Sequence, residues 1–160
     1  MVDIEFKKIK LVLTDIDGVW TNAKFYYTKD GFFQKAFSTY DGMAVSLLRK
    51  FDIETVIVSS ENCMAVKARA NKLKIKHLYI GEENKLQRAN SLCKKFDLEL
   101  ENMAFIGDDL NDLELLKKVG FSCMPPNSPI LNIFTPHYIT NKAGGEGAFR
   151  EFADVILSHK

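Results

Sequence analysis

The sequence has no long apolar run and no excess of charge of one sign. No stretch reaches the roughly 18 apolar residues that indicate a membrane-spanning helix, and residues 1–10 lack the apolar stretch of a signal peptide. Lys and Arg number 22 against 21 Asp and Glu, a formal net charge of +1. A general binder of nucleic acid or of anionic membranes would carry a basic excess, so neither partner is predicted.

Cysteine is also scarce, and its three positions form no pattern. Cys63, Cys93 and Cys123 are far apart, and no C-x-x-C pair occurs. A disulfide framework or a zinc–thiolate site is therefore not predicted. The three histidines are scattered as well. We expect three buried thiols in a reducing cytoplasm.

What the sequence does contain is an alternation of apolar runs and helical patterns. Apolar runs typical of buried strands occupy residues 9–14, 53–60, 77–80, 103–106 and 121–124, and helical spacing of apolar residues covers 41–51, 63–73, 84–96, 111–119 and 148–157. Such alternation predicts parallel βαβ units. We expect an α/β fold with a Rossmann-like, doubly wound parallel sheet, in one domain over residues 1–160.

Residues 19–39 interrupt this alternation. Aromatic residues flank Asp30-Gly31, and a D-G turn in that setting indicates a β-hairpin. We expect the hairpin to project from the sheet, and the alternative is an irregular loop.

Polar side chains stand where the predicted strands end. Because parallel sheets carry their ligands beyond the carboxyl ends of the strands, these groups should gather at one edge of the sheet. The set consists of Asp15 and Asp17 after the first strand, Ser59 at the end of the second, Lys85 after the third, and Asp108 and Asp112 after the fourth.

The chemistry of this set points to phosphate. Four carboxylates at close range repel one another strongly, and a hard divalent cation resolves the conflict. Oxygen ligands without His or Cys favour Mg²⁺, which usually also takes a substrate phosphate oxygen. Ser59 and Lys85 suit the remaining phosphate oxygens. In the D-x-D pair, one carboxylate can act as nucleophile on phosphorus and the other as general acid and base.

These residues resemble the four motifs of the haloacid dehalogenase superfamily of phosphatases. D-x-D-G-V-x-T (residues 15–21) is similar to the first motif, Ser59 to the second, Lys85 to the third and G-D-D-x-N-D (107–112) to the fourth. Together with the C-terminal G-G-E-G-A-F-R-E, the pattern is most similar to a small branch without a cap domain. That branch acts on phosphates of 3-deoxy-2-ulosonic acids, such as KDO 8-phosphate and the nine-carbon KDN or N-acylneuraminate 9-phosphates. The resemblance covers residues 8–157.

The resemblance implies roles at the centre of the site. Asp15 would attack phosphorus and form an aspartyl-phosphate. Asp17 would protonate the leaving sugar oxygen and then activate the hydrolytic water. Asp15, Asp108 and the main-chain carbonyl of Asp17 would hold Mg²⁺.

The resemblance also implies supporting roles around that centre. Ser59 and Lys85 would anchor the phosphoryl group. Asn111, Asp112 and Asp109 would support Lys85 or the waters around the metal. For Asp109, a helix cap or a turn former is the alternative.

Substrate contacts are implied at several further positions. Ser60-Glu61 stands where KDO 8-phosphate members usually have Gly-Arg, whereas nine-carbon members more often carry Glu. We expect Glu61 to accept hydrogen bonds from sugar hydroxyls, which slightly favours a nine-carbon substrate; the alternative is an exposed carboxylate at a helix N-terminus. Arg69 matches a family position that contacts the substrate. A family substrate loop is matched by Thr39, Asp41 and Gly42, of which Asp41 alternatively caps its own helix.

The resemblance implies a homotetramer with active sites near subunit interfaces. Larger members of the superfamily cover the substrate with a cap domain, and no stretch here could supply one. The site of one subunit is therefore expected to be open, with the segment 142–147 and Arg150 closing a neighbour's site.

Two other functions stay open at this point. One is a phosphatase of a different sugar phosphate. The other is a non-catalytic domain that assists a sugar-nucleotide synthetase, which would be expected to have lost Asp15, Asp17 or Lys85. A phospho-receiver domain is not favoured, because no Asp follows the third predicted strand.

Overall fold

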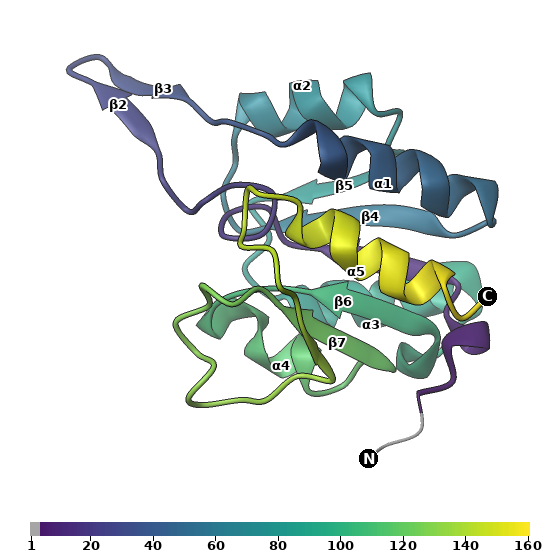
Figure 1. Ribbon diagram of the computed structural model, residues 1–160. Coiled ribbons are helices and arrows are strands. Elements are labelled where there is room, and N and C mark those ends of the chain that lie inside the picture. The colour runs from purple at the N-terminus through teal and green to yellow at the C-terminus, as the bar shows by residue number, and fades with distance from the viewer. Residues whose placement is uncertain (1–3) are drawn as a thin grey trace.

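The computed structural model describes residues 4–160, apart from the side chains at positions 32 and 33 (Figure 1). Its centre is a sheet in the order β5-β4-β1-β6-β7-β8, in which every neighbouring pair is parallel. The strands are β1 (Leu11–Thr14), β4 (Glu54–Ser59), β5 (His77–Ile80), β6 (Met103–Ile106), β7 (Phe121–Met124) and β8 (Tyr138–Ile139). The predicted α/β fold with a parallel sheet is confirmed.

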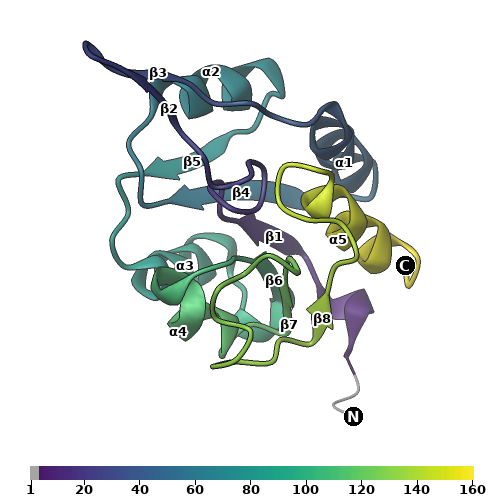
Figure 2. The same ribbon diagram turned by 60° about the vertical axis from the view of Figure 1, so that its left-hand side comes forward.

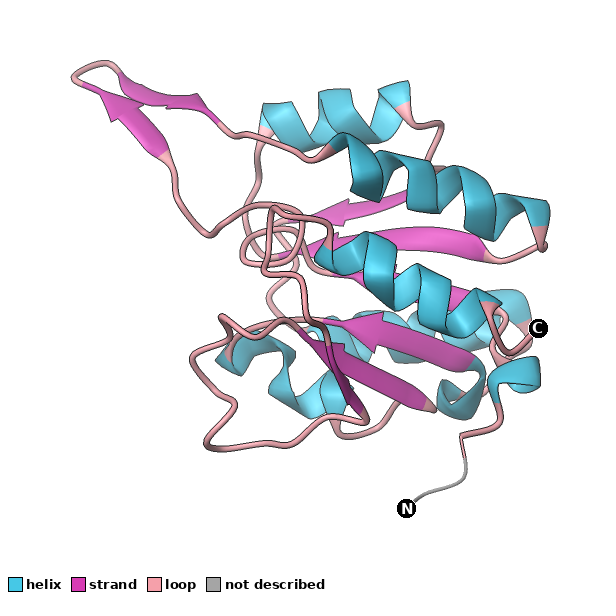
Figure 3. Cartoon of the chain, viewed as in Figure 1, coloured by secondary structure: helices cyan, strands magenta, loops and turns pink. Residues whose placement is uncertain are grey.

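Helices cover both faces of the sheet (Figure 3). Helices α1 (Thr39–Lys50), α2 (Met64–Lys72) and α5 (Ala148–Leu157) pack on one face, and α3 (Lys85–Phe96) and α4 (Leu113–Leu116) on the other. Strand β1 serves both cores, since Val12 packs on the first face and Leu11 and Leu13 on the second. This alternation follows from the two-residue period of a strand. Short 3₁₀ turns occur at η1 (Phe6–Lys8), η2 (Leu100–Asn102) and η3 (Leu110–Asp112).

The predicted hairpin is present and projects from the sheet (Figure 2). Its strands are β2 (Tyr26–Thr28) and β3 (Gly31–Gln34), which pair antiparallel within the predicted range 19–39. The alternative of an irregular loop is therefore wrong.

Two elements differ from the prediction. In place of the helix expected over 111–119, the chain forms the 3₁₀ turn η3, whose start is capped by Asp109 and Asp112, and then the short helix α4, which ends at Leu116. Strand β8 was not predicted, since its two residues form no apolar run. Across residues 4–160, no helix is both long and apolar enough to cross a membrane.

The register of the sheet positions the site. Thr14 ends β1 and pairs with Ile57 of β4 and Ile106 of β6. The residues that follow Thr14 and Ile106 therefore leave the sheet side by side, while β4 continues to Ser59 on the other flank of β1.

Candidate active site

A hollow of about 280 Å³ lies at the carboxyl edge of the sheet. Three segments supply its walls: the loop after β1, the end of β4 and the loop after β6. The lining residues are Asp15, Asp17, Ala23, Ser59, Ser60, Glu61, Asp108, Asp109 and Asn111. All of these except Ala23 and Ser60 belong to the set of candidate site residues drawn from the sequence.

Lys85 lies beneath this hollow with its side chain fully buried. Its Nζ is 2.8 Å from Asp15 Oδ1 and 2.5 Å from Asp112 Oδ1. Burial by itself would lower the pKa of Lys85, but the carboxylates of Asp15 and Asp112 outweigh it and raise that pKa. Lys85 is therefore held as a cation beside the carboxylate of Asp15.

Asp112 ties Lys85 to the loop after β6. Its second oxygen, Oδ2, accepts hydrogen bonds from the backbone N–H of Asp108 at 2.8 Å and of Asp109 at 3.3 Å. Both carboxylate oxygens of Asp112 are thus engaged. Asp112 is thus in direct contact with Lys85, and its supporting role stays a prediction.

Carboxylates are crowded at the centre of the site. Burial and the repulsion from Asp112 raise the pKa of Asp15 to about 7, although Lys85 opposes the shift. Burial, together with the charges of Asp15, Asp112 and Asp109, raises the pKa of Asp108 to about 8. Ionising both of these buried acids at neutral pH is energetically unfavourable unless further positive charge is present.

The donor set fits a hard cation. Oxygen atoms of Asp15, Asp108 and Asp112 lie within 4.8 Å of one another, and oxygen donors are those that Mg²⁺ prefers. Both oxygens of Asp112 are engaged, one by Lys85 and one by backbone amides, whereas Lys85 faces only Oδ1 of Asp15. Asp15 and Asp108 are therefore the side chains of this group left to hold an ion. Gly18 (φ +89°) makes this geometry possible, since a Cβ there would lie 1.8 Å from Asp108 Oδ2.

The side chain of Asp17 is held from two directions. Thr21 Oγ1 donates to its Oδ1 at 3.1 Å, and Lys35 Nζ lies 2.6 Å from its Oδ2. Thr21 belongs to the D-x-D-G-V-x-T motif, so the sequence contained a signal for it. Lys35 follows β3 of the hairpin and carried no such signal, and its contact with Asp17 was missed.

The remaining predicted residues of this edge have distinct environments. Ser59 is buried at the end of β4. Asn111 Nδ2 donates to Ser60 Oγ at 2.9 Å, so the contact that the structure gives Asn111 is not with Lys85. Asp109 is the N-cap of η3 and accepts from Leu110 N at 2.7 Å, which matches the alternative stated for it. Glu61 is exposed on the rim of the hollow.

The other predicted substrate residues form a separate group where α1 meets α2. Arg69 Nη2 donates to the Ser38 carbonyl at 3.0 Å and lies so close to Gly42 that a Cβ at Gly42 would be 2.7 Å from it. Thr39 is exposed at the start of α1. Together with Asp41, these residues are not among the described residues that line the hollow at Asp15.

Asp41 does not cap its own helix, so that alternative is wrong. Ser38 is the N-cap of α1, and its hydroxyl accepts from Tyr40 N. Asp41 is instead fully buried, and its Oδ1 accepts from Arg150 N at 2.9 Å in the first turn of α5. Its carboxylate therefore serves the N-terminus of a different helix, which is favourable for a negative charge.

The glycine-rich segment 142–147, called the tail below, lies directly on the loop after β1, as Figures 1 and 2 both show. Gly145 N donates to the Val19 carbonyl at 3.0 Å. Asn127 bridges the two segments: its Nδ2 donates to the Gly18 carbonyl at 3.4 Å, and its Oδ1 accepts from Gly144 N at 2.7 Å. The tail thus supports the backbone that carries Asp17.

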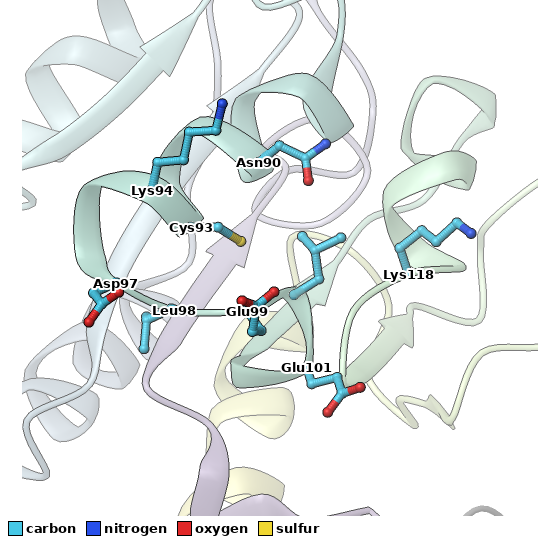
Figure 4. Close-up of a pocket in the computed structure, with 9 residues that line it drawn as sticks. Asn90, Cys93, Lys94, Asp97, Leu98, Glu99, Glu101 and Lys118 are labelled. Carbon is cyan, nitrogen blue, oxygen red and sulfur yellow. The ribbon is translucent and has the colours of Figure 1, made fainter.

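A larger hollow of about 850 Å³ lies elsewhere, between the end of α3 and η2 (Figure 4). Its walls mix Lys94 and Lys118 with Asp97, Glu99 and Glu101. These charges are of both signs, and none of the motif residues is present among them. The smaller hollow at Asp15 is therefore the candidate active site.

Comparison with known proteins identifies the family of the chain. A family model described as haloacid dehalogenase-like hydrolase matches residues 60–143. The 3-deoxy-D-manno-octulosonate 8-phosphate phosphatase of Escherichia coli (strain K12) is 36% identical over 151 residues, which cover 94% of this chain and 80% of that protein.

Solved structures give the same result. The phosphatase of that name from Moraxella catarrhalis, in complex with a magnesium ion, a phosphate ion and KDO, matches with a TM-score of 0.92 and 35% identity, over 97% of this chain and 89% of the other. The cobalt-bound phosphatase from Haemophilus influenzae matches with a TM-score of 0.90 and 32% identity, over 96% and 90%. The chain described here belongs to the family of haloacid dehalogenase-like hydrolases.

Proposed function

We propose that this protein is a Mg²⁺-dependent phosphatase of a 3-deoxy-2-ulosonic acid phosphate. The observation that carries the proposal is the grouping of Asp15 and Asp108 in one hollow at the carboxyl edge of the sheet, with the Lys85 ammonium buried against Asp15. Similar proteins named as KDO 8-phosphate phosphatases cover nearly the whole chain, which supports a sugar-acid phosphate as the substrate class.

In the first step, a carboxylate oxygen of Asp15 attacks phosphorus. A bond forms between this oxygen and phosphorus, and the bond from phosphorus to the sugar oxygen breaks. Asp17 transfers its proton to the leaving sugar oxygen. Lys85, 2.8 Å from Asp15 Oδ1, offsets negative charge at the reacting group, and the Ser59 hydroxyl donates a hydrogen bond to a phosphate oxygen.

In the second step, Asp17 removes a proton from water. The water oxygen bonds to phosphorus, and the bond between phosphorus and Asp15 breaks, which returns Asp15 as a carboxylate and releases phosphate. Mg²⁺, held by Asp15, Asp108 and the main-chain carbonyl of Asp17, would supply positive charge that neutralises the phosphate oxygens and the crowded carboxylates.

The length of the sugar acid depends on the rim of the site. Glu61 is exposed beside the hollow and can accept hydrogen bonds from sugar hydroxyls. This slightly favours a nine-carbon KDN or N-acylneuraminate 9-phosphate over KDO 8-phosphate. The alternative is that Glu61 has no substrate contact and is an exposed carboxylate that stabilises the N-terminus of α2.

We further propose a homotetramer located in the cytoplasm. Thr39, Gly42 and Arg69 lie apart from the hollow of their own chain, so a contact between Arg69 and a substrate would be made across a subunit interface. Exposed Tyr26 and Tyr27 on the hairpin offer an apolar surface for assembly. The cytoplasmic location is supported by the free state of all three cysteines.

A phosphate-release screen tests the proposal. The protein is incubated with Mg²⁺ and KDO 8-phosphate, KDN 9-phosphate, N-acylneuraminate 9-phosphate or common hexose phosphates, with EDTA as the control. We expect turnover of the sugar-acid phosphates that EDTA abolishes. Preference for hexose phosphates would establish a different sugar-phosphate phosphatase, and no turnover of any substrate would favour a non-catalytic domain. A clear advantage of KDO 8-phosphate would contradict the role given to Glu61.

A further inference from the structure

Lys35 connects the hairpin to the candidate active site. It follows β3 directly, and its side chain is fully buried. The ammonium nitrogen is 2.6 Å from Asp17 Oδ2 and 4.3 Å from the centre of the Phe25 ring. Phe25 precedes β2 and Lys35 follows β3, so the residues that flank the two strands of the hairpin meet at the Lys35 ammonium, which in turn contacts Asp17.

Burial makes this contact consequential. An ammonium group removed from water is strongly unfavourable unless a counter-charge and further polar contacts replace its hydration. For Lys35, the structure supplies the Asp17 carboxylate and the face of an aromatic ring. The position of Lys35 is therefore coupled to that of Asp17.

The contacts on Asp17 fix the orientation of its carboxylate. Oδ2 faces Lys35, and Oδ1 accepts from Thr21 Oγ1 at 3.1 Å. With one partner on each oxygen, the plane of the carboxylate is defined. The arrangement parallels that of Asp15, whose Oδ1 faces Lys85. Each aspartate of the D-x-D pair thus has its own buried lysine, one from α3 and one from the hairpin.

We propose that Lys35 is a positioning residue for Asp17: it holds the side chain at the place where Asp17, when protonated, gives its proton to the leaving sugar oxygen and where the resulting carboxylate takes a proton from the hydrolytic water. This inference rests on the proposed function, in which Asp17 is the general acid. It assigns the hairpin a part in the chemistry of its own subunit, in addition to any part in assembly.

The leaving group provides a specific test. A sugar alkoxide is a poor leaving group and needs a proton as the bond to phosphorus breaks, whereas p-nitrophenolate leaves with little help. Loss of a well-placed general acid therefore lowers kcat/KM for a sugar phosphate far more than for p-nitrophenyl phosphate. A residue that serves only folding or phosphate binding would affect both substrates equally.

The experiment compares Lys35→Met, Lys35→Arg and a matched control, Lys24→Met, which makes the same change at an exposed position on the approach to the hairpin. For Lys35→Met, we expect kcat/KM for the sugar-acid phosphate to fall roughly 100-fold and that for p-nitrophenyl phosphate less than about 3-fold. Lys35→Arg should recover part of the loss, and Lys24→Met should match the wild type. Equal losses on the two substrates, or no loss, would overturn the proposal.

A second readout does not depend on turnover. In NMR spectra of protein with isotope-labelled lysine, the buried ammonium of Lys35 should give a slowly exchanging signal that Asp17→Asn removes and Lys24→Met leaves in place. Fast exchange in the wild type would overturn the contact itself. A wild type that shows this signal but cleaves neither substrate would refute the proposed function while leaving the contact intact, so the two failures are distinguishable.

Discussion

Lys85 and Asp112 form a fully buried ion pair across 27 residues of sequence, with 2.5 Å between Nζ and Oδ1. The pair lies beneath the candidate active site and joins the start of α3 to the loop after β6. The ion pair therefore contributes both to the fold and to the electrostatics of Asp15.

Replacing Lys85 with Met should test both contributions. The change leaves Asp112 and Asp15 buried without their cation, and such removal of one partner is strongly destabilising. We expect the free energy of unfolding, measured with urea, to fall by about 3 kcal/mol, and turnover to be lost. Lys117→Met, at an exposed pair with Glu114, is the control and should change stability by less than about 1 kcal/mol. Equal effects of the two variants would contradict the structure.

Replacing Asp108 with Asn should separate two effects on stability: the gain from Mg²⁺ binding and the loss from repulsion between buried carboxylates. Without the ion, Asp108 is a buried carboxylate near Asp15 and Asp112, so the neutral variant should be more stable than the wild type. With Mg²⁺ at ten times its Kd, the wild type should gain about 1.4 kcal/mol and the variant much less. Thermal unfolding with Mg²⁺ and with EDTA measures both. A wild type insensitive to Mg²⁺ would contradict the proposed metal site.

Much of this arrangement was predictable from the sequence because it depends on local patterns. Strands β5, β6 and β7 and helix α5 occur at the predicted residues, since apolar runs and helical periodicity are properties of neighbouring residues. Asp15, Ser59 and Asp108 meet because parallel strands end at one edge.

What could not be predicted depends on contacts between distant segments. The link from Lys35 to Asp17 requires the hairpin to fold back on the loop after β1. Asp41 lies in the first turn of α1, where sequence indicates a local cap, but its partner is the N–H of Arg150, 109 residues away. Tertiary packing decides such contacts, and no local pattern records them.

Gly144→Ala tests the support that the tail gives to the loop after β1. A Cβ at Gly144 would lie 1.9 Å from the Gly18 carbonyl oxygen and 2.7 Å from that of Thr21. The two backbones must separate, and we expect a loss of about 2 kcal/mol in the free energy of unfolding together with lower kcat. Gly31→Ala has a strained φ but nothing within 4 Å of the added Cβ, so it should lose only about 1 kcal/mol. If Gly144→Ala left the free energy of unfolding and kcat unchanged, the close packing of the tail against this loop would be contradicted.

Asp41→Asn should show that ionisation of the buried Asp41 carboxyl lowers the free energy of unfolding as the pH rises. Asp41 is fully buried, and its Oδ2 has no hydrogen-bond partner. Burial raises the pKa of Asp41 to about 6, although the N–H groups of Arg150 and Phe149 and the charge of Arg69 oppose the shift. The ordinary pKa of an unfolded Asp is about 3.9. The folded state therefore binds this proton more tightly than the unfolded state does.

The sign of the effect follows from that difference. A raised folded pKa contributes stability that is present below about pH 4 and is lost as the pH rises through about 6. Asn keeps the size and the acceptor for Arg150 N but does not ionise. Relative to the wild type, Asp41→Asn should therefore gain about 2 to 3 kcal/mol in the free energy of unfolding between about pH 4 and pH 7. Urea unfolding across this range measures the gain. As the control, Asp52→Asn at an exposed site should give a curve of unfolding free energy against pH that is parallel to that of the wild type. If the curve for Asp41→Asn were parallel as well, Asp41 would be ionised within the fold at low cost.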